Sequence, residues 1–310
     1  MKEMTVNKEN FDNCVSFHIK NGAFMGRLVR LDNVLNTILD KHAYPRPVSA
    51  VLAETTVLAV MLSSTIKYEG LFTLQIQSNG PVSLVVVDVK STGEVRAYAK
   101  YDVQHLEHAQ NLRKTSGEIE AAPHLLGEGV LAFTVDQGPE TELYQGIVEL
   151  KGKTLAECAL RYFKQSEQIE TKLRLFLEPP AGDFKKWAGA GIMLQKLPLK
   201  GGSEVSDEDA AEAWNEAGIF LDSLTPEEVF NADLSSAELL HRLYHSSQLQ
   251  VSACKPYLFG CRCSREKLLN TLRSFSEEEI SSLAEQGKVK VTCDFCSEQY
   301  TFDKGELLRQ

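Results

Sequence analysis

Hydrophobic and polar residues alternate with different periods along this chain, and each period predicts one kind of element. Apolar residues surround the stretch from Arg46-Pro47 to about Lys67 on most sides, which predicts a buried helix ending before Gly70. Strand-like runs follow, with turn residues such as Ser78-Asn79-Gly80-Pro81 between them. They cover residues 71–77, 82–89, 94–99, 130–135 and 143–150. Together they predict a mostly antiparallel sheet.

A second helix and two more strands complete this region. Thr154, with Glu157 three residues later, predicts a capping box and a helix running to about Gln168. Residues 171–177 and 192–197 are strand-like. The stretch Ala188-Gly189-Ala190-Gly191 lacks the lysine and the helix of a phosphate-binding loop. We expect it instead to let two backbones pack closely.

From Ser203 onward the pattern changes to short helices with marked starts. Thr225-Pro226-Glu227-Glu228 combines a capping residue, a first-turn proline and an acidic third position, and Ser235 with Glu238 repeats the cap. The apolar stripes of these helices are narrow. Because short helices are marginal on their own, they need a surface to lie on.

Charge is concentrated in this same helical stretch. The chain has 310 residues and a formal net charge of −10. Residues 203–245 hold eleven acidic residues and one base, Arg242, so this segment alone carries 1 − 11 = −10. Self-repulsion lowers the folding margin of such a segment. No basic face with interleaved aromatic residues occurs, so we expect no nucleic-acid partner.

The remaining composition, 43% hydrophobic and 25% charged, is typical of a soluble globular protein. Residues 1–13 have no apolar signal-peptide core, and no apolar run approaches 18 residues, so we expect no export and no membrane partner. Seven cysteines in an unexported chain indicate reduced thiols rather than a disulfide framework. The expected location is cytoplasmic.

Four of these cysteines form two closely spaced pairs near the C-terminus. They are Cys261-Arg-Cys263 and Cys293-Asp-Phe-Cys296, with 29 residues between the pairs. Two thiol pairs at such spacing can close a tetrahedral four-sulfur site, in which zinc is the usual ion and an iron–sulfur cluster is rarer. Strand-like runs on both sides place the second pair at a hairpin turn.

The first pair has an unusual spacing. Zinc knuckles usually leave two or more residues between paired ligands, whereas Cys261 and Cys263 leave one. From an extended chain both can still reach one metal, and without metal they lie near enough for a disulfide. The four thiolates are therefore either permanent structural ligands or two oxidisable dithiols, and the spacing leaves both open.

The segment around these cysteines is poor in large apolar residues. Ser264 and Ser276 with Glu279 predict two short helices before the hairpin. A unit of about 65 residues with so small a core cannot be very stable. Zinc binding contributes on the order of 10–16 kcal/mol in small domains, against a stability of ~5–15 kcal/mol for whole domains. We therefore expect this unit to fold with metal and to unfold without it.

Several longer motifs resemble the heat-shock protein 33 family of bacterial redox-regulated holdases. Both cysteine pairs and their separation match its zinc signature. The other matching stretches are Gly70-Leu71-Phe72-Thr73-Leu74-Gln75, Asn79-Gly80-Pro81, Gly129-Val130-Leu131-Ala132-Phe133-Thr134, Tyr144-Gln145-Gly146-Ile147-Val148, Leu155-Ala156-Glu157-Cys158 and Tyr162-Phe163-Lys164-Gln165-Ser166-Glu167-Gln168. The resemblance covers nearly the whole chain. One departure is residues 188–191, where a simpler glycine pair would be usual.

The resemblance implies an α+β fold in three parts. These are an N-terminal mixed, mostly antiparallel sheet domain with helices (residues 1–200), an acidic helical linker (201–245) and a small C-terminal zinc-binding redox-switch domain (246–310). It also implies an ATP-independent chaperone, not an enzyme, that binds unfolding proteins under oxidative stress. By the same analogy, Zn²⁺ is held in the inactive reduced state, and disulfides Cys261–Cys263 and Cys293–Cys296 form on activation with zinc release. The active form is expected to be a homodimer.

Other readings of the same residues were weighed. A thiol-disulfide oxidoreductase using Cys293 and Cys296 is the main alternative, although such a motif normally begins a helix after a strand. Cys254 could replace a ligand but is more simply a bystander, and Cys14 and Cys158 are expected in the core.

Histidines and tryptophans offer weaker signals. His241 and His245 share a helical face, yet with one four-thiol site complete they are expected to be solvated, as are His105 and His108. Trp187 and Trp214 are expected to anchor packing.

Overall fold

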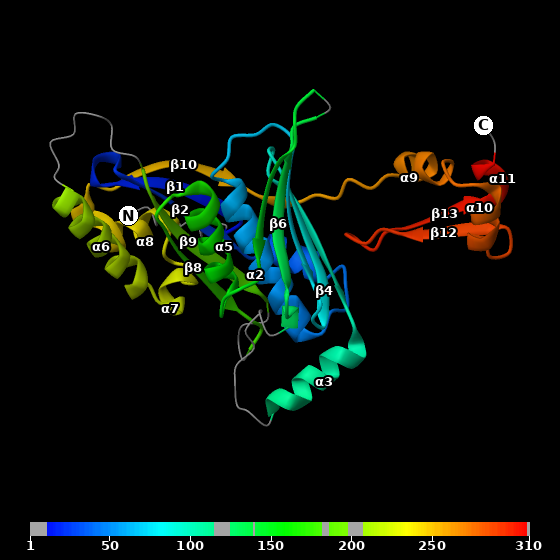
Figure 1. Ribbon diagram of the computed structural model, residues 1–310, viewed down its shortest axis with the longest axis horizontal. Coiled ribbons are helices and arrows are strands. Elements are labelled where there is room, and N and C mark those ends of the chain that lie inside the picture. The colour runs from blue at the N-terminus through cyan, green and yellow to red at the C-terminus, as the bar shows by residue number, and fades with distance from the viewer. Residues whose placement is uncertain (1–10, 115–124, 139, 182–185, 198–206, 309–310) are drawn as a thin grey trace, which may run out of the picture.

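The computed structural model describes residues 11–114, 125–138, 140–181, 186–197 and 207–308. The expected boundary at residues 200–201 lies outside these ranges. As expected, the fold is mixed α and β with mainly antiparallel sheets. Figure 1 shows two large sheets with helices around them and a small hairpin unit at one end of the molecule.

The first sheet contains five antiparallel strands in the order β10-β1-β2-β9-β8. The strands are β1 (Asn13–Ile19), β2 (Phe24–Leu31), β8 (Thr171–Glu178), β9 (Ala188–Lys196) and β10 (Gln250–Pro256). The second sheet has the order β11-β5-β4-β3-β6-β7, antiparallel except for the parallel pair β11 and β5. Its strands are β3 (Leu71–Ser78), β4 (Val82–Lys90), β5 (Glu94–Tyr101), β6 (Gly129–Asp136), β7 (Tyr144–Glu149) and β11 (Leu258–Phe259).

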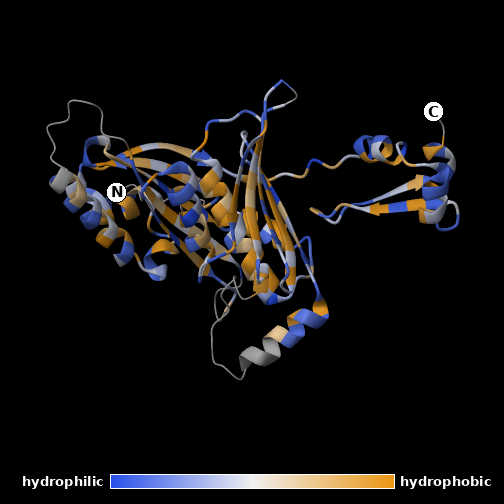
Figure 2. Ribbon diagram, viewed as in Figure 1, coloured by the Kyte–Doolittle hydropathy of each residue, from blue (hydrophilic) through white to orange (hydrophobic). Residues whose placement is uncertain are grey.

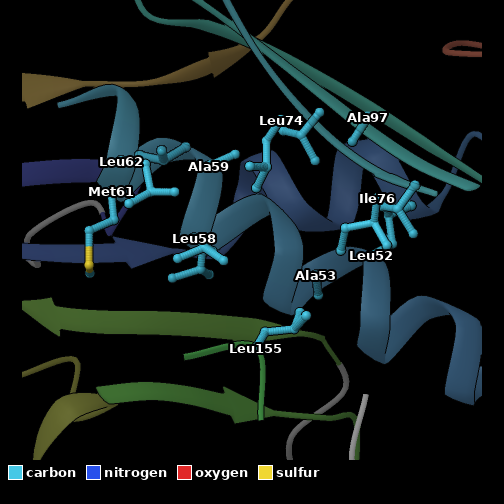
Figure 3. Close-up of a cluster of buried hydrophobic side chains, with 14 of the residues drawn as sticks. Leu52, Ala53, Leu58, Ala59, Met61, Leu62, Leu74, Ile76, Ala97 and Leu155 are labelled. Carbon is cyan, nitrogen blue, oxygen red and sulfur yellow. The ribbon is translucent and has the colours of Figure 1, made fainter. Parts of the chain in front are cut away.

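Helix α2 (Arg46–Ser63) lies between the two sheets, in contact with strands of both (Figure 3). By length and composition it could cross a membrane, but 83% of its apolar window is buried inside the protein. Its buried hydroxyls are satisfied locally, because Thr55 and Thr56 donate to the carbonyls four residues earlier, each at 2.7 Å. Helix α2 is thus a core helix, as expected from its apolar surroundings.

The helix ends earlier than the sequence suggested. We expected it to continue to about Lys67, but Ser63, Ser64 and Thr65 each donate a side-chain hydroxyl to the carbonyl three residues back, at 2.6–2.8 Å. These bonds satisfy the last carbonyls of the helix and stop it before Gly70. The three consecutive hydroxyl residues, Ser63, Ser64 and Thr65, could have indicated this helix end in the sequence.

Glycines of β9 bring this helix close to the first sheet. A Cβ at Gly191 would lie 2.5 Å from Met61 Cε, and one at Gly189 would lie 2.7 Å from Val57 Cγ2. The expected close packing at residues 188–191 is therefore found, but between a strand backbone and helix side chains rather than between two backbones.

The remaining helices lie around the two sheets or, for the last three, in the C-terminal part of the chain. They are α1 (Asn33–Leu39), α3 (Val103–Lys114), α5 (Leu155–Tyr162) with a π-helical turn (Phe163–Glu167), α6 (Asp207–Ser223), α7 (Pro226–Val229), α8 (Ser236–Tyr244), α9 (Arg265–Leu272), α10 (Glu277–Leu283) and α11 (Lys304–Leu307). The predicted capping boxes of α7, α8 and α10 are all present.

The acidic helices α6, α7 and α8 lie on the first sheet. Trp214 packs on Phe24 with ring centroids 5.1 Å apart, and Tyr244 stacks on Phe17 at 5.7 Å. All four side chains belong to one buried cluster shared by the sheet and the helices. The surface that these narrow apolar stripes require is therefore the face of the first sheet.

Two arginines of the first sheet also bind the backbone of these helices. The fully buried Arg30 donates to the carbonyls of Asn231 and Leu234, both at 2.7 Å. Arg174 donates to three carbonyls at the end of α6, those of Leu221, Asp222 and Leu224, at 2.8–3.0 Å. A cation at a helix C-terminus complements both the free carbonyls and the helix dipole.

The last part of the chain forms a small unit, here called the hairpin module (residues 260–308). It contains α9, α10, α11 and the hairpin of β12 (Lys288–Thr292) and β13 (Gln299–Asp303). Figure 2 shows hydrophobic and hydrophilic segments mixed along its ribbon. Its buried core comprises five side chains among the residues described, Leu272, Ile280, Val289, Phe302 and Leu307. The C-terminal domain expected over residues 246–310 thus starts with two strands, β10 and β11, that pair with the large sheets.

Candidate metal centre

The four paired cysteines meet at the tip of the hairpin module. Cys293 and Cys296 lie in the turn that joins β12 to β13, where the Cys293 amide donates to the Glu298 carbonyl and the Ser297 amide donates to the Cys293 carbonyl, both at 2.9 Å. Cys261 and Cys263 lie in the extended segment between β11 and α9. Ser264 caps α9 directly after this segment by accepting from the Lys267 amide.

The sulfur atoms are arranged as a compact cluster. All four lie within 4.8 Å of one another. The Sγ–Sγ distance is 3.4 Å for Cys261–Cys263, 3.7 Å for Cys261–Cys293 and 3.4 Å for Cys263–Cys296. A tetrahedron of sulfurs about 2.3 Å from a central zinc has edges of about 3.8 Å. The spacing and the thiolate donors therefore suit a tetrahedral metal ion.

The electrostatic surroundings distinguish the four thiols. Burial opposes ionisation of Cys261, but hydrogen bonds involving Cys263, Cys296 and Arg96 outweigh it and lower its pKa to about 7. Burial raises the pKa of Cys293 and of Cys296. Cys261 is thus more readily ionised than either cysteine of the second pair, and a thiolate is the form that reacts and binds metal.

Side chains from outside the cysteine motifs also contact the sulfurs. The Tyr300 hydroxyl donates to Cys263 Sγ at 3.3 Å from β13. Arg96 of β5 lies 3.9 Å from Cys261 Sγ through its Nη1. Arg96 is in turn held by the buried carboxylate of Asp88 at 2.7 Å, and Arg262, between the first two cysteines, reaches the same carboxylate at 2.8 Å.

The turn that holds the second cysteine pair contacts the second sheet. Phe295, inside the Cys293–Cys296 turn, lies 3.7 Å from the Arg96 guanidinium and 4.7 Å from the Tyr98 ring centroid. Ser297 donates to the Lys41 carbonyl at 2.7 Å, and the Phe295 carbonyl lies 3.3 Å from His42 Nε2. The sulfur cluster therefore lies at the junction between the hairpin module and the rest of the protein.

These partners were missed by sequence reasoning. Arg96, Asp88 and Lys41 are more than 150 residues away from the cysteines in the chain, and no local pattern marks them. Tyr300 is one of several polar residues in a strand and carries no motif.

The other singled-out residues lie elsewhere. Cys254 is exposed on β10 and does not belong to the cluster, while Cys14 and Cys158 are buried as expected. His241 on α8 and His245, which directly follows this helix, are both exposed, with ring centroids 5.8 Å apart. Trp187 and Trp214 are both buried in packed clusters.

Comparison with known proteins decides the family. The model of the Hsp33 protein family matches residues 12–303. The chain belongs to the Hsp33 family. Similar curated proteins are the 33 kDa chaperonins of Caulobacter vibrioides, 35% identical over 94% of this chain and 95% of the relative, and of Ectopseudomonas mendocina, 37% identical over 91% and 89%.

The fold of this Hsp33-family chain is also found in a solved structure. The crystal structure of the 33 kDa chaperonin (heat shock protein 33 homologue) from Thermotoga maritima superposes with a TM-score of 0.75, at 22% identity and 96% coverage of both chains. The family and its curated relatives indicate a chaperone role, in agreement with the resemblance seen in the sequence. The turn position of Cys293 and Cys296 differs from the helix start that is typical of thiol oxidoreductases.

Proposed function

We propose that this protein is an ATP-independent holdase whose client binding is controlled by the oxidation state of Cys261, Cys263, Cys293 and Cys296. The observation that carries the proposal is the position of the four-sulfur cluster. The cluster joins the extended Cys261–Cys263 segment to the hairpin turn, in a module with five buried core side chains among the residues described. The same turn lies against the second sheet. Any change at the sulfurs therefore acts on both the module and its docking.

In the reduced state the four thiolates would hold Zn²⁺. The bound ion would cross-link the Cys261–Cys263 segment to the hairpin turn and so supply the stability that the small core lacks. Arg96, Arg262 and Tyr300 would offset the negative charge of four thiolates. In this state the module stays docked and the protein is inactive.

In the oxidised state the same sulfurs would form disulfides Cys261–Cys263 and Cys293–Cys296. Each pair of thiolates gives two electrons to one peroxide molecule, which takes up two protons from the solvent and leaves as two waters. The Cys261 and Cys263 sulfurs, 3.4 Å apart, have to approach to about 2.05 Å. Disulfide sulfurs are poor ligands, so zinc is released and the module unfolds.

Loss of the module would then weaken the acidic linker. Helix α8 leads through a 3-10 turn (His245–Ser247) to β10 and β11, which pair with β1 and β5, and then to the cysteine segment. Unfolding of the module would therefore release the end of the segment that holds these two strands in place. The charge of the linker equals the net charge of the whole chain, and repulsion within the linker favours an open chain. The buried face shared with the first sheet would become available to unfolding clients and to a second copy of the chain.

The test follows zinc release, helicity and aggregation of a denatured client in one peroxide titration. All three should change together, on the full-length protein. The Cys254→Ser variant is the matched control, because Cys254 is exposed and outside the cluster. Full suppression of aggregation by the reduced, zinc-loaded protein would refute the switch. Catalytic turnover with glutathione would favour an oxidoreductase instead.

No nucleic-acid or membrane partner and no catalytic activity are included in this proposal. The expected location is the cytoplasm, where reducing conditions keep the thiols available for zinc.

A further inference from the structure

Strand β10 closes one edge of the first sheet. It is the last strand in the order β10-β1-β2-β9-β8 and lies antiparallel to β1 (Figure 1). From its end at Pro256 the chain runs through Tyr257 and β11 to Cys261, the first cysteine of the sulfur cluster. The strand that covers the edge of β1 is therefore joined to the segment that the proposed oxidation would release.

Few side-chain contacts hold β10 in place. Of residues 250–260, Tyr257 alone is buried, at 3% exposure. The pairing with β1 is also irregular, because its register shifts between Val15 and Phe17. Val251, which lies opposite Phe17, is 42% exposed. Backbone hydrogen bonds therefore hold β10 more than side-chain burial does.

Strand β1, in contrast, is buried on both of its faces. Val15, Phe17 and Ile19 belong to the apolar cluster shared with the acidic helices. Cys14 belongs to the cluster around α2. Removal of β10 would leave a row of β1 N–H and C=O groups unpaired beside these apolar side chains. Such groups are costly when they lack partners, and a row of them is a template for another strand.

The native occupant shows what fits this edge, namely an extended antiparallel segment of seven residues. Val15 and Phe17 now face Cys254 and Val251, so a segment with larger apolar side chains at these two positions would bury more surface than β10 does. Backbone pairing also accepts many sequences, because every residue except proline offers the same N–H and C=O groups. This tolerance suits the binding of varied unfolding proteins.

We propose that the edge of β1, once β10 is released, binds an extended apolar segment of an unfolding client as a replacement strand. The inference rests on the proposed function and adds the conformation and chemical class of the client segment. In the reduced protein β10 occupies this edge. The site is therefore closed until the hairpin module unfolds, as the redox control of client binding requires.

The probe is a fluorescein-labelled peptide in which seven residues alternate between valine and threonine, with lysines at both ends. It is titrated against the full-length protein, either reduced and zinc-loaded or fully oxidised with peroxide. The oxidised protein should bind the peptide about tenfold more tightly or better, because β10 no longer fills the edge. Replacing the valines by serine should weaken binding about tenfold or more. Equal binding to the two forms of the protein would overturn the proposal.

Methylation of the peptide backbone separates strand pairing from general hydrophobic binding. In an antiparallel edge pair, every second residue of the peptide directs its N–H group toward β1, and the residues between them direct theirs to solvent. Single N-methyl groups should therefore alternate along the peptide between a loss of about tenfold in affinity and little change. An equal loss at every position would contradict pairing with an edge. This measurement uses the unmutated protein, so it does not depend on the folding of a variant.

A cross-strand bond tests the place of binding. Val15 and Cys254 are paired in register, and residues paired in this way lie within reach of a disulfide. Val15→Cys should therefore bond to Cys254 and hold β10 on β1, as mass spectrometry can verify. The reference is Val15→Cys combined with Cys254→Ser, which has the same new thiol but cannot form the bond.

Peroxide should release zinc from both of these variants. The locked variant should then bind the peptide about tenfold more weakly than the reference, because its edge stays closed. Equal affinity of the two oxidised variants would place the binding elsewhere and overturn the proposal. A second copy that donates its own β10 to the edge would instead make the peptide affinity fall as the protein concentration rises, and this result would overturn the client assignment.

The same samples separate this inference from the proposed function. If peroxide caused neither zinc release nor suppression of client aggregation, the redox switch would be rejected, and this inference with it. If the switch worked but the methylated peptides showed no alternation, only the replacement strand would be rejected.

Discussion

The guanidinium of Arg96 lies 3.7 Å from the centre of the Phe295 ring, and its Nη1 lies 3.9 Å from Cys261 Sγ. One side chain of the second sheet therefore contacts a residue inside the second cysteine pair and a sulfur of the first. The Asp88 carboxylate forms an ion pair with this arginine, with Oδ2 at 2.7 Å from Nη2. The same guanidinium thus contributes to the docking of the hairpin module and to the electrostatic surroundings of its sulfurs.

Arg96→Ala is expected to make activation easier. The variant loses the ring contact with Phe295 and a positive charge beside the thiolates, while leaving the cysteines in place. Half-maximal zinc release should need several-fold less peroxide. Arg96→Lys keeps the charge but loses the planar stacking, so it should be intermediate. An unchanged peroxide midpoint in both variants would show that docking does not set the threshold.

Cys293→Ser is expected to unfold the hairpin module without disturbing the large sheets. Three thiolates cannot complete the four-sulfur site, and the five-residue core is too small to hold the module. Amide exchange should become fast in residues 260–308 and stay slow in α2. Cys254→Ser should behave like wild type. Retained protection of the module after chelation would count against a metal-dependent fold.

Arg174→Met is expected to loosen the acidic linker selectively. The arginine holds three carbonyls at the end of α6, and each lost bond to a charged donor costs about 1.5–3 kcal/mol. Limited proteolysis should cut within residues 207–244 faster, at unchanged zinc content. Arg46→Met, at an exposed arginine at the start of α2, is the control. Equal cleavage rates in both variants would contradict this role.

Glu54→Gln is expected to remove a pH dependence of stability. Burial raises the pKa of Glu54 to about 7, above its ordinary 4.5. The folded state therefore keeps a proton that the unfolded state loses, so the free energy of unfolding falls as pH rises from about 4.5 to about 7. The loss amounts to about 3–4 kcal/mol at most.

Denaturant unfolding at pH 5 and pH 8 measures this difference. The glutamine variant should lose less stability than wild type between the two pH values, while Glu69→Gln, at an exposed position, should not change the difference. A wild-type stability that does not fall over this interval would show that Glu54 is not buried as a neutral acid.

Much of the fold follows from local patterns in the sequence. The capping residues Thr225, Ser235, Ser264 and Ser276 begin helices where expected, because a cap needs only residues three positions apart. The end of α2 was placed too late, because three hydroxyl bonds at its C-terminus compete with the apolar pattern.

By itself, the sequence determined which thiols could meet, since cysteine spacing along a short segment limits the geometry of a four-sulfur site. It also determined that the acidic helices need a surface. Only the tertiary structure decided which surface that is, and that Arg96, Asp88 and Lys41 surround the cysteine turn. Such partners depend on long-range strand order and register, which local residue patterns do not encode.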